Sequence, residues 1–218
     1  MFLQKSSVLP FVLALVASPL PAGTVDFRTE TALRAAACES RFQQWHLEPS
    51  LASGAFYSPI RANIFSQPRR PSFDYTETEI RAGIMLNSPY DAGFFRGNFE
   101  FLLGLGGGAI FEGPGNALGV GDMFIRYNFI RQRSRIVPYL QLGAGLVFSD
   151  AARDHPQRII GRTQEFGLQA GFGCRFLLNE EWSFDVEWVY QHISNADTAD
   201  RNVGVNALGG VVALTRSL

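Results

Sequence analysis

The sequence has few of the residues that build metal sites or disulfide frameworks. Its 218 residues include two cysteines, Cys38 and Cys174, and three histidines. The two cysteines form neither a metal-ligand spacing nor a dense disulfide framework, and His46 and His155 are isolated. The formal net charge is −1, so no overall basic field favours nucleic acid as a partner. We therefore expect no metal, no cofactor and no nucleic acid.

Long apolar runs are also missing. The run VLPFVLALVA (8–17) follows Lys5 and precedes the small and helix-breaking residues SPLPAG. A transmembrane helix needs about 20 apolar residues, so this run is too short to span a bilayer. Its position and flanks are typical of a secretory signal. We predict a signal peptide over residues 1–22 and export of the chain. Segment 23–48 receives no function.

Phenylalanine and glycine are abundant instead, with 19 and 22 copies, while charged residues make up only 18% of the chain. From residue 49 to 218, short apolar segments alternate with turn signals, which is typical of an all-β chain. Eight is the smallest usual number of strands in a membrane barrel. We predict eight strands, at 50–58, 74–86, 94–106, 118–130, 136–148, 163–177, 182–194 and 203–216.

Side chains alternate between two kinds along these segments. In WSFDVEWVYQHIS, Trp182, Phe184 and Trp188 fall on one face, and Asp185 and Glu187 on the other. A soluble sandwich would bury the bulky face, whereas a membrane barrel would turn it toward lipid. The second face is rich in glycine and in charges of both signs, which suits a narrow, filled lumen better than a solvated surface. We therefore predict an eight-stranded antiparallel transmembrane β-barrel with a filled polar interior.

The connections support the same choice. Long ones are expected at 58–73, 107–119, 149–162 and 195–204, with short turns between them. Outer-membrane barrels have long external loops and short periplasmic turns. With both barrel termini in the periplasm, the strand over 182–194 ends at the outer edge of the membrane.

Polar residues gather at that edge. His192 and Ser194 have the parity of Trp188, so they belong to the bulky face, and Asn206 has the parity of Leu208 and Leu214. All three are expected to face lipid, near the headgroups of the outer leaflet. Polar groups there are costly unless they have partners.

The pair His192 and Ser194 has the spacing of a base and a nucleophile. Residues two apart on a strand project to the same side, so the imidazole can take the hydroxyl proton before attack on an ester carbonyl. Asn195 or nearby backbone N–H groups are candidates to stabilise the oxyanion. The plainer alternative is an ordinary interfacial end of a strand, and the residues alone leave both readings open.

The stretch YQHISNA (190–196), followed by a polar loop and a last strand, resembles the lipid A 3-O-deacylase family of outer-membrane barrels. RGNFEFLL (96–103), IRYNF (125–129) and VPYLQLGAGLVFSD (137–150) are similar to other strands of that family. The resemblance implies an eight-stranded barrel that hydrolyses the 3-linked acyl ester of lipid A without metal or cofactor. It implies His192 as base, Ser194 as nucleophile and Asn195 as an oxyanion candidate.

One position departs from the family pattern. The resemblance places a Glu that orients the His about a dozen residues after the Ser, where this chain has Asn206. An amide accepts a hydrogen bond from imidazole but does not stabilise imidazolium by charge, although Cys–His–Asn triads exist. Asp197 and Asp200 in the loop are weaker candidates for the role of Asn206. Glu187 lies on the lumen face.

Two hypotheses therefore stand for function. The first is an outer-membrane esterase acting on lipid A (lipopolysaccharide), with His192, Ser194 and Asn206 as the catalytic residues. The alternative is a structural or lipid-binding barrel without catalysis, and a soluble β-sandwich is the third architecture. The acyl length, the lipid A variant and the oligomeric state, a homo-oligomer included, are left open by the sequence.

Overall fold

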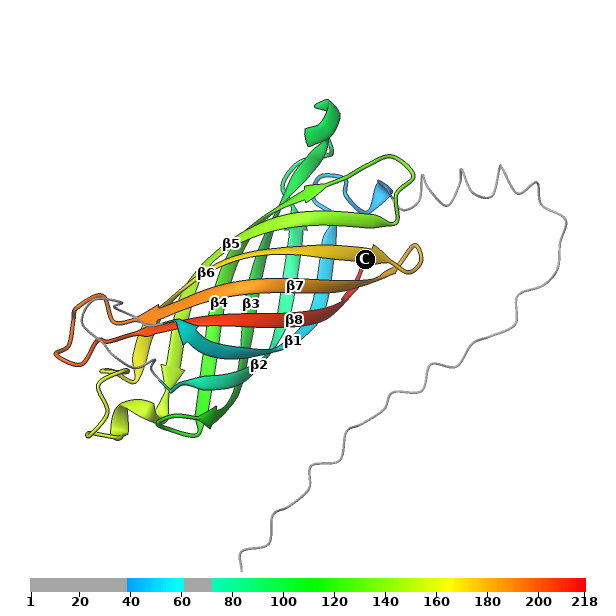
Figure 1. The fold of residues 1–218 in the computed structure, drawn as a ribbon. Helices are drawn as coiled ribbons and strands as arrows, with labels where there is room; N and C mark the ends of the chain where they lie inside the picture. Colours follow the sequence, from blue (N-terminus) through cyan, green and yellow to red (C-terminus); the bar gives the residue numbers. More distant parts are fainter. Residues whose placement is uncertain (1–38, 61–71) are drawn as a thin grey trace, which may run out of the picture.

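Eight antiparallel strands pair in chain order and close into a barrel (Figure 1). The computed structural model describes residues 39–60 and 72–218. The predicted signal peptide and most of segment 23–48 lie outside the described residues. The strands are β1 (Leu47–Ile60), β2 (Asp74–Met85), β3 (Gly97–Glu112), β4 (Ala117–Phe129), β5 (Ile136–Ser149), β6 (Gln164–Leu177), β7 (Trp182–Ser194) and β8 (Val205–Arg216). Two short 3-10 helices are η1 (Gly93–Phe95) and η2 (Asp150–Arg153).

The two ends of the barrel differ in their connections. The end that carries residues 113–116, 150–163 and 195–204 is called the loop end, and the opposite end, with residues 86–96, 130–135 and 178–181, the turn end. In Figure 1 the β7–β8 connection lies at the loop end and the C-terminus at the turn end. No helix among the described residues is long and apolar enough to cross a membrane.

The expected alternation of long and short connections is wrong at two places. The long loop expected at 107–119 is only the four residues between β3 and β4, and the β2–β3 connection spans 86–96 instead. Strand β3 continues through its glycine run because Gly106, Gly107 and Gly108 keep pairing with β4. A Cβ at Gly108 would overlap the carbonyl oxygen of Thr76, so this close backbone approach requires glycine. Most of the expected loop at 58–73 lies outside the described residues.

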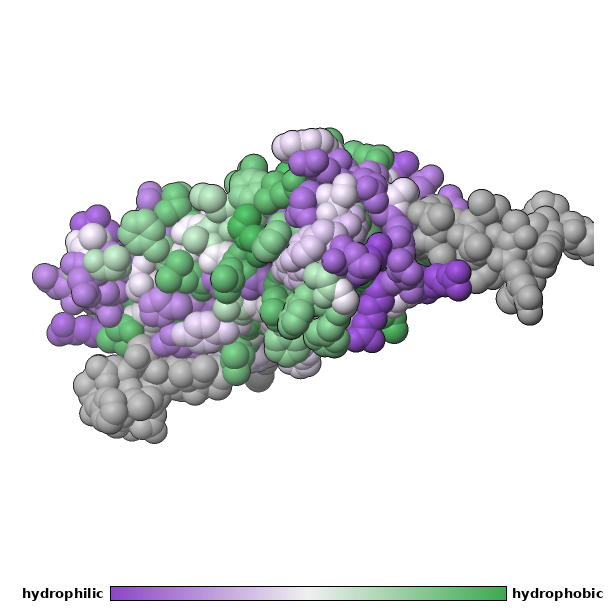
Figure 2. Space-filling model, turned by 90° about the horizontal axis from the view of Figure 1, so that it is seen from above, coloured by the Kyte–Doolittle hydropathy of each residue, from purple (hydrophilic) through white to green (hydrophobic). Residues whose placement is uncertain are grey.

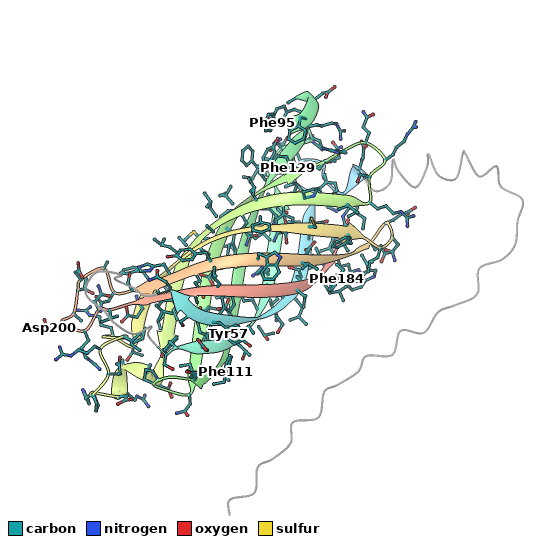
Figure 3. The ribbon with its side chains drawn as sticks, in the orientation of Figure 1. Tyr57, Phe95, Phe111, Phe129, Phe184 and Asp200 are labelled. Carbon is teal, nitrogen blue, oxygen red and sulfur yellow. The ribbon has the colours of Figure 1, made fainter. Side chains whose placement is uncertain are left out.

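Large apolar side chains cover the outer wall of the barrel. On β7, the even-numbered Phe184, Trp188 and Tyr190 are exposed while the odd-numbered residues between them are buried. Figure 2 shows one face, on which hydrophobic residues gather mainly in the middle and hydrophilic residues toward both ends. Tyr57 and Phe111 point outward in Figure 3, and their rings pack edge to face. An apolar wall around a charged interior is the arrangement of a membrane-spanning barrel, as the alternation predicted.

Charged side chains fill the lumen. Arg175 binds Glu48 at 2.6 Å and Asp185 at 3.0 Å, and Arg126 binds Glu187 at 3.0 Å. The side chains of these ion pairs are at most 2% exposed. Guanidinium groups suit such sites because they offer several donors in a fixed plane, so one arginine can serve carboxylates from different strands. The predicted lumen residues are therefore confirmed as interior.

The residues just before β1 close the turn end. Phe42 is 1% exposed and packs with Met85, Ile130, Val137 and Leu177, while Arg41 binds Glu48 at 2.7 Å. The sequence assigned no role to this part of segment 23–48. Arg41 and Phe42 are two adjacent residues outside a strand, so no alternating pattern indicates that they are buried inside the barrel.

Replacing Phe42 by alanine is expected to destabilise the barrel by about 3 kcal/mol, because the cavity left in this cluster cannot collapse between fixed strands. The free energy of unfolding by guanidinium chloride in detergent measures the loss. Phe94→Ala is the matched control, since Phe94 lies at the same end and is 69% exposed. Equal stability of the two variants would show that Phe42 does not seal the barrel.

Candidate active site

Strands β7 and β8 bring His192 and Asn206 directly opposite each other near the loop end. Side chains of directly paired residues on one face of a sheet have Cβ atoms about 5 Å apart. Ser194 ends β7 two residues beyond His192, and Tyr190 precedes it by two. All four residues therefore occupy the outer, lipid-facing side of the wall, on the face that the alternation predicted.

Hydrogen bonds join these four side chains into one chain. The Nε2 atom of His192 lies 3.0 Å from Ser194 Oγ, and Nδ1 lies 2.9 Å from Asn206 Oδ1. The Tyr190 hydroxyl donates to the same Asn206 oxygen at 2.6 Å. Because Oδ1 only accepts, His192 Nδ1 carries the proton. Nε2 then has the lone pair that can accept the proton of Ser194.

The hydrogen-bonded side chains differ in their exposure, with the Asn206 end buried and the Ser194 end partly exposed. Asn206 is 7% exposed although it faces outward, since Tyr190 and His192 cover it. His192 and Ser194 are half-buried. A buried acceptor holds the imidazole in place, while Ser194 keeps part of its surface exposed on the outer wall. This is the base–nucleophile arrangement of serine hydrolases, with an amide in the third position.

Asn195, the predicted oxyanion residue, lies just past the chain and is 1% exposed. Its backbone N–H donates to Asn202 Oδ1 at 3.0 Å, and its Nδ2 donates to the Arg201 carbonyl at 2.9 Å. Both bonds stay inside the β7–β8 loop. The structure thus gives Asn195 a role in shaping the loop, and its role toward an oxyanion stays a prediction.

The loop carboxylates lie apart from His192. Asp197 accepts a hydrogen bond from Asn202 Nδ2 at 2.7 Å. Asp200 is at the tip of the β7–β8 loop (Figure 3). The Nδ1 partner of His192 is Asn206, so the weaker candidates Asp197 and Asp200 are not the residues that orient the imidazole in this structure.

Two neighbours of the site were not anticipated from the sequence. Tyr190 is the second donor to Asn206, and its parity with His192 was a usable signal. Gly204 adopts φ +73°, and a Cβ there would lie 3.6 Å from His192 Cε1 and 3.7 Å from Ser194 Cβ. A side chain at this position would combine backbone strain with a tight contact to the Ile193 carbonyl oxygen, and its Cβ would touch the nucleophile at ordinary contact distance. The sequence shows Gly204 only as a single glycine before the last strand, and such a glycine indicates a turn rather than a place in the site.

The loops beside the site are tied to one another. Arg201 donates to the carbonyl oxygens of Ala152 at 2.8 Å and Asp154 at 2.9 Å, which joins the β7–β8 loop to the β5–β6 loop. Asp150 accepts hydrogen bonds from the backbone N–H groups of Asn116 and Ala117, which lower the pKa of its carboxyl group. The loops thus form a connected rim around the lipid-facing strand ends.

An apolar groove of about 730 Å³ begins below the site on the outer wall. Tyr190 and Leu208, one step along the strands from His192 and Asn206, line its near end. Its far part lies over Gly210, which sits between Trp188 and Ala55 in the register. No atom lies within 4 Å of where a Gly210 Cβ would be. Small residues between large ones therefore leave an open groove whose near end lies beside His192 and Asn206.

Comparisons with known proteins find one similar family. The family model described as lipid A 3-O-deacylase (PagL) matches residues 120–215. That segment runs from β4 to β8 and contains all four residues of the hydrogen-bonded chain. No curated protein sequence matches the chain.

Two solved structures share the fold. The outer membrane enzyme PagL has a TM-score of 0.50 at 16% identity, covering 76% of this chain and 97% of that one. Neisserial surface protein A (NspA) has a TM-score of 0.50 at 14% identity, covering 80% and 97%. At such identities the likeness concerns the fold alone, which is that of an outer-membrane β-barrel. Over residues 120–215, the chain is similar to the lipid A 3-O-deacylase (PagL) family.

Proposed function

We propose that this protein is an outer-membrane esterase that removes an ester-linked acyl chain from lipid A. The observation that carries the proposal is the chain of contacts from Ser194 through His192 to Asn206 on the lipid-facing wall. A lumen-facing site would serve a soluble substrate, whereas this one meets molecules that lie in the membrane. The family relation supports lipid A as the substrate, and the resemblance indicates the 3-position.

The proposed mechanism has two halves. Ser194 Oγ attacks the ester carbonyl carbon while His192 Nε2 takes the hydroxyl proton. Collapse of the tetrahedral intermediate breaks the ester C–O bond, and the imidazolium gives its proton to the departing sugar oxygen, which leaves as a hydroxyl. Water then attacks the acyl-serine with the same base, releasing the fatty acid and restoring Ser194. Asn206 holds the imidazole in the tautomer with a free Nε2, and Tyr190 fixes Asn206.

The substrate's position follows from the groove and the loop rim. An acyl chain in the groove would place its ester end next to His192 and Ser194. The sugar and phosphate groups would then lie at the polar loop end, which we place outside the cell. This requires no movement of substrate out of the membrane, since both parts of the lipid keep their usual depth.

The direct test is the mass spectrum of lipid A from Gram-negative cells that express the full chain. We expect new species that lack one hydroxyacyl group, compared with cells carrying the empty vector. An unchanged spectrum, with the protein folded in the outer membrane, would favour the alternative of a barrel without catalysis.

Filling the groove should change which esters are hydrolysed. Gly210→Leu is expected to lower kcat/KM for long-chain esters about tenfold, the effect of losing one or two methylene-sized contacts, and to spare short-chain esters. Rates with p-nitrophenyl esters of increasing length measure the effect. Gly119→Leu is the control, since Gly119 is also outward-facing, with nothing nearer to its Cβ position than a carbonyl oxygen at 3.8 Å. A uniform loss across chain lengths would argue against an acyl site in the groove.

A further inference from the structure

The lumen carries many more negative than positive side chains. Among the described residues, nine carboxylates and four arginines are buried. The carboxylates are Glu48, Asp74, Glu77, Glu79, Glu100, Asp122, Glu165, Asp185 and Glu187, and the arginines are Arg41, Arg81, Arg126 and Arg175. Unpaired buried charge is expensive, so each carboxylate needs a compensating partner.

The arginines form one connected network that uses five of the carboxylates. Arg41 and Arg175 meet at Glu48, Arg175 and Arg126 share Asp185 and Glu100, and Arg126 and Arg81 share Glu187. The network ends at Glu79, which Arg81 contacts at 2.6 Å. No buried arginine of the described residues lies beyond it toward the loop end.

Two more carboxylates are stabilised by the backbone. Asp74 accepts the N–H of Ser58 at 2.8 Å. Glu165 accepts the N–H groups of Gly161 and Arg162, both at 2.9 Å. Among the described residues, Glu77 and Asp122 thus have neither an ion pair with an arginine nor a hydrogen bond from a backbone N–H.

Glu77, Glu79 and Asp122 converge on one point inside the lumen. One oxygen from each lies within 4.8 Å of the other two. Their exposed fractions are 4%, 1% and 3%. Both oxygens of Asp122 lack a hydrogen-bond partner in the described part of the chain, as do Glu77 Oε2 and Glu79 Oε1. Asp122 is therefore a buried carboxylate that faces the other two and whose oxygens make no hydrogen bond of regular geometry with the described residues, although the Gln169 amide lies close enough to interact with it.

We propose that these three carboxylates bind a divalent cation of the calcium type. Calcium takes oxygen ligands at about 2.3–2.6 Å, so ligand atoms on opposite sides of the ion are about 5 Å apart, as the spacing here allows. The set has no nitrogen or sulfur ligand, which disfavours zinc and copper. The ion would supply the positive charge that the arginine network does not extend to. It would join β2 to β4, which have no direct pairing because β3 lies between them.

The site is distinct from the proposed esterase centre. Its residues face the lumen, whereas His192 and Ser194 face the membrane from the other side of the wall. Apolar side chains including Phe56, Tyr75 and Ile193 fill the loop end of the lumen above it. We therefore expect the ion to be taken up as the barrel folds and to be released slowly afterwards.

The test is refolding of the mature chain in detergent with CaCl₂ or with EDTA, followed by desalting, metal analysis and thermal melting. We expect about one calcium per chain after refolding with CaCl₂ and a melting temperature about 5–10 °C above that of the EDTA sample. Because protons compete for the same oxygens, the bound calcium should fall in samples refolded at acidic pH. Wild-type protein without bound calcium and with equal melting temperatures would overturn the proposal, and protons would then neutralise the cluster.

Variants separate the site from the rest of the lumen. Asp122→Asn, alone and with Glu77→Gln, is expected to lose the calcium and to melt at the same temperature in both conditions. Glu165→Gln is the matched control, since it removes a buried lumen carboxylate outside the cluster and should retain one calcium per chain. Equal calcium in the double variant and the wild type contradicts the assignment. Metal content is measured independently of ester hydrolysis. Failure of the calcium proposal and failure of the proposed esterase function can therefore be distinguished.

Discussion

Replacing Ser194 by alanine is expected to abolish ester hydrolysis while the barrel stays folded. Removal of the nucleophile in serine hydrolases costs on the order of 10⁴–10⁶-fold in kcat, because the acyl-enzyme cannot form. Ser194 lies at the end of β7, and its hydroxyl is hydrogen-bonded to His192. Loss of that hydroxyl should therefore leave the strand pairing unchanged. Lipid A mass spectra and rates with a p-nitrophenyl ester both report the loss.

A matched serine defines the specificity of this effect. Ser53 also faces outward from a strand, where it contacts Thr78 at 2.9 Å, away from the site. Ser53→Ala should keep wild-type activity. The double variant His192→Ala with Ser194→Ala should be no slower than Ser194→Ala alone, since the two residues act as a unit. Activity that survives in Ser194→Ala would remove Ser194 from the mechanism and leave the family relation without its expected chemistry here.

Much of the fold could be predicted because, along a strand, every second residue is apolar and the residues between are small or polar. The seventh strand was predicted over 182–194, and β7 has these bounds, since its aromatic and acidic residues alternate without a break. The third strand was predicted to end at 106 but continues to Glu112. Its glycines have no side chains to show alternation, so the sequence there resembles a loop. The strand continues there because its backbone pairs with β4. That pairing joins segments apart in the sequence, so the local pattern does not reveal it.

The site could be predicted only in part, for a similar reason. Parity places His192, Ser194 and Asn206 on one face because a strand has a fixed period. The register of β8 against β7 then decides that Asn206, and no loop carboxylate, meets His192. Tyr190 and Gly204 became visible only with that register. The lumen network was foreseen as charges of both signs, yet which carboxylates remain without an arginine depends on contacts across the whole barrel.

The fold itself does not decide between enzyme and inactive barrel. A named enzyme and a surface protein both match it at a TM-score of 0.50. Function resides in the few side chains placed on such a scaffold. The residue that matters most here is Asn206, because it occupies the position where the family resemblance implies a Glu.

Changing Asn206 to aspartate is therefore expected to raise kcat, by about 10–100-fold. Asn206 already holds the imidazole in the correct tautomer, so the gain comes from charge alone, and a hydrogen bond to a charged group is worth about 1–2 kcal/mol more than a neutral one. Aspartate has the shape of asparagine, so its oxygen can keep the position 2.9 Å from His192 Nδ1 and 2.6 Å from the Tyr190 hydroxyl. The added negative charge stabilises the imidazolium that forms when Ser194 loses its proton. Initial rates of ester hydrolysis in detergent measure the gain.

Three further variants determine whether charge or geometry causes the gain. Asn206→Leu removes the acceptor and should fall below the wild type, because the imidazole is no longer held in the tautomer with a free Nε2. Tyr190→Phe should lower the rate of the wild type more than that of Asn206→Asp, since the amide needs Tyr190 to fix its orientation and a carboxylate has two equivalent oxygens. Asn206→Asp with Ser194→Ala should be inactive.

The gain in rate of Asn206→Asp should also disappear at acidic pH, as the new carboxylate takes up a proton and again resembles a neutral amide. An aspartate variant no faster than the wild type would mean that Asn206 already supports all the catalysis this site can deliver, or that the site performs none; activity of the wild type above Ser194→Ala distinguishes these two results.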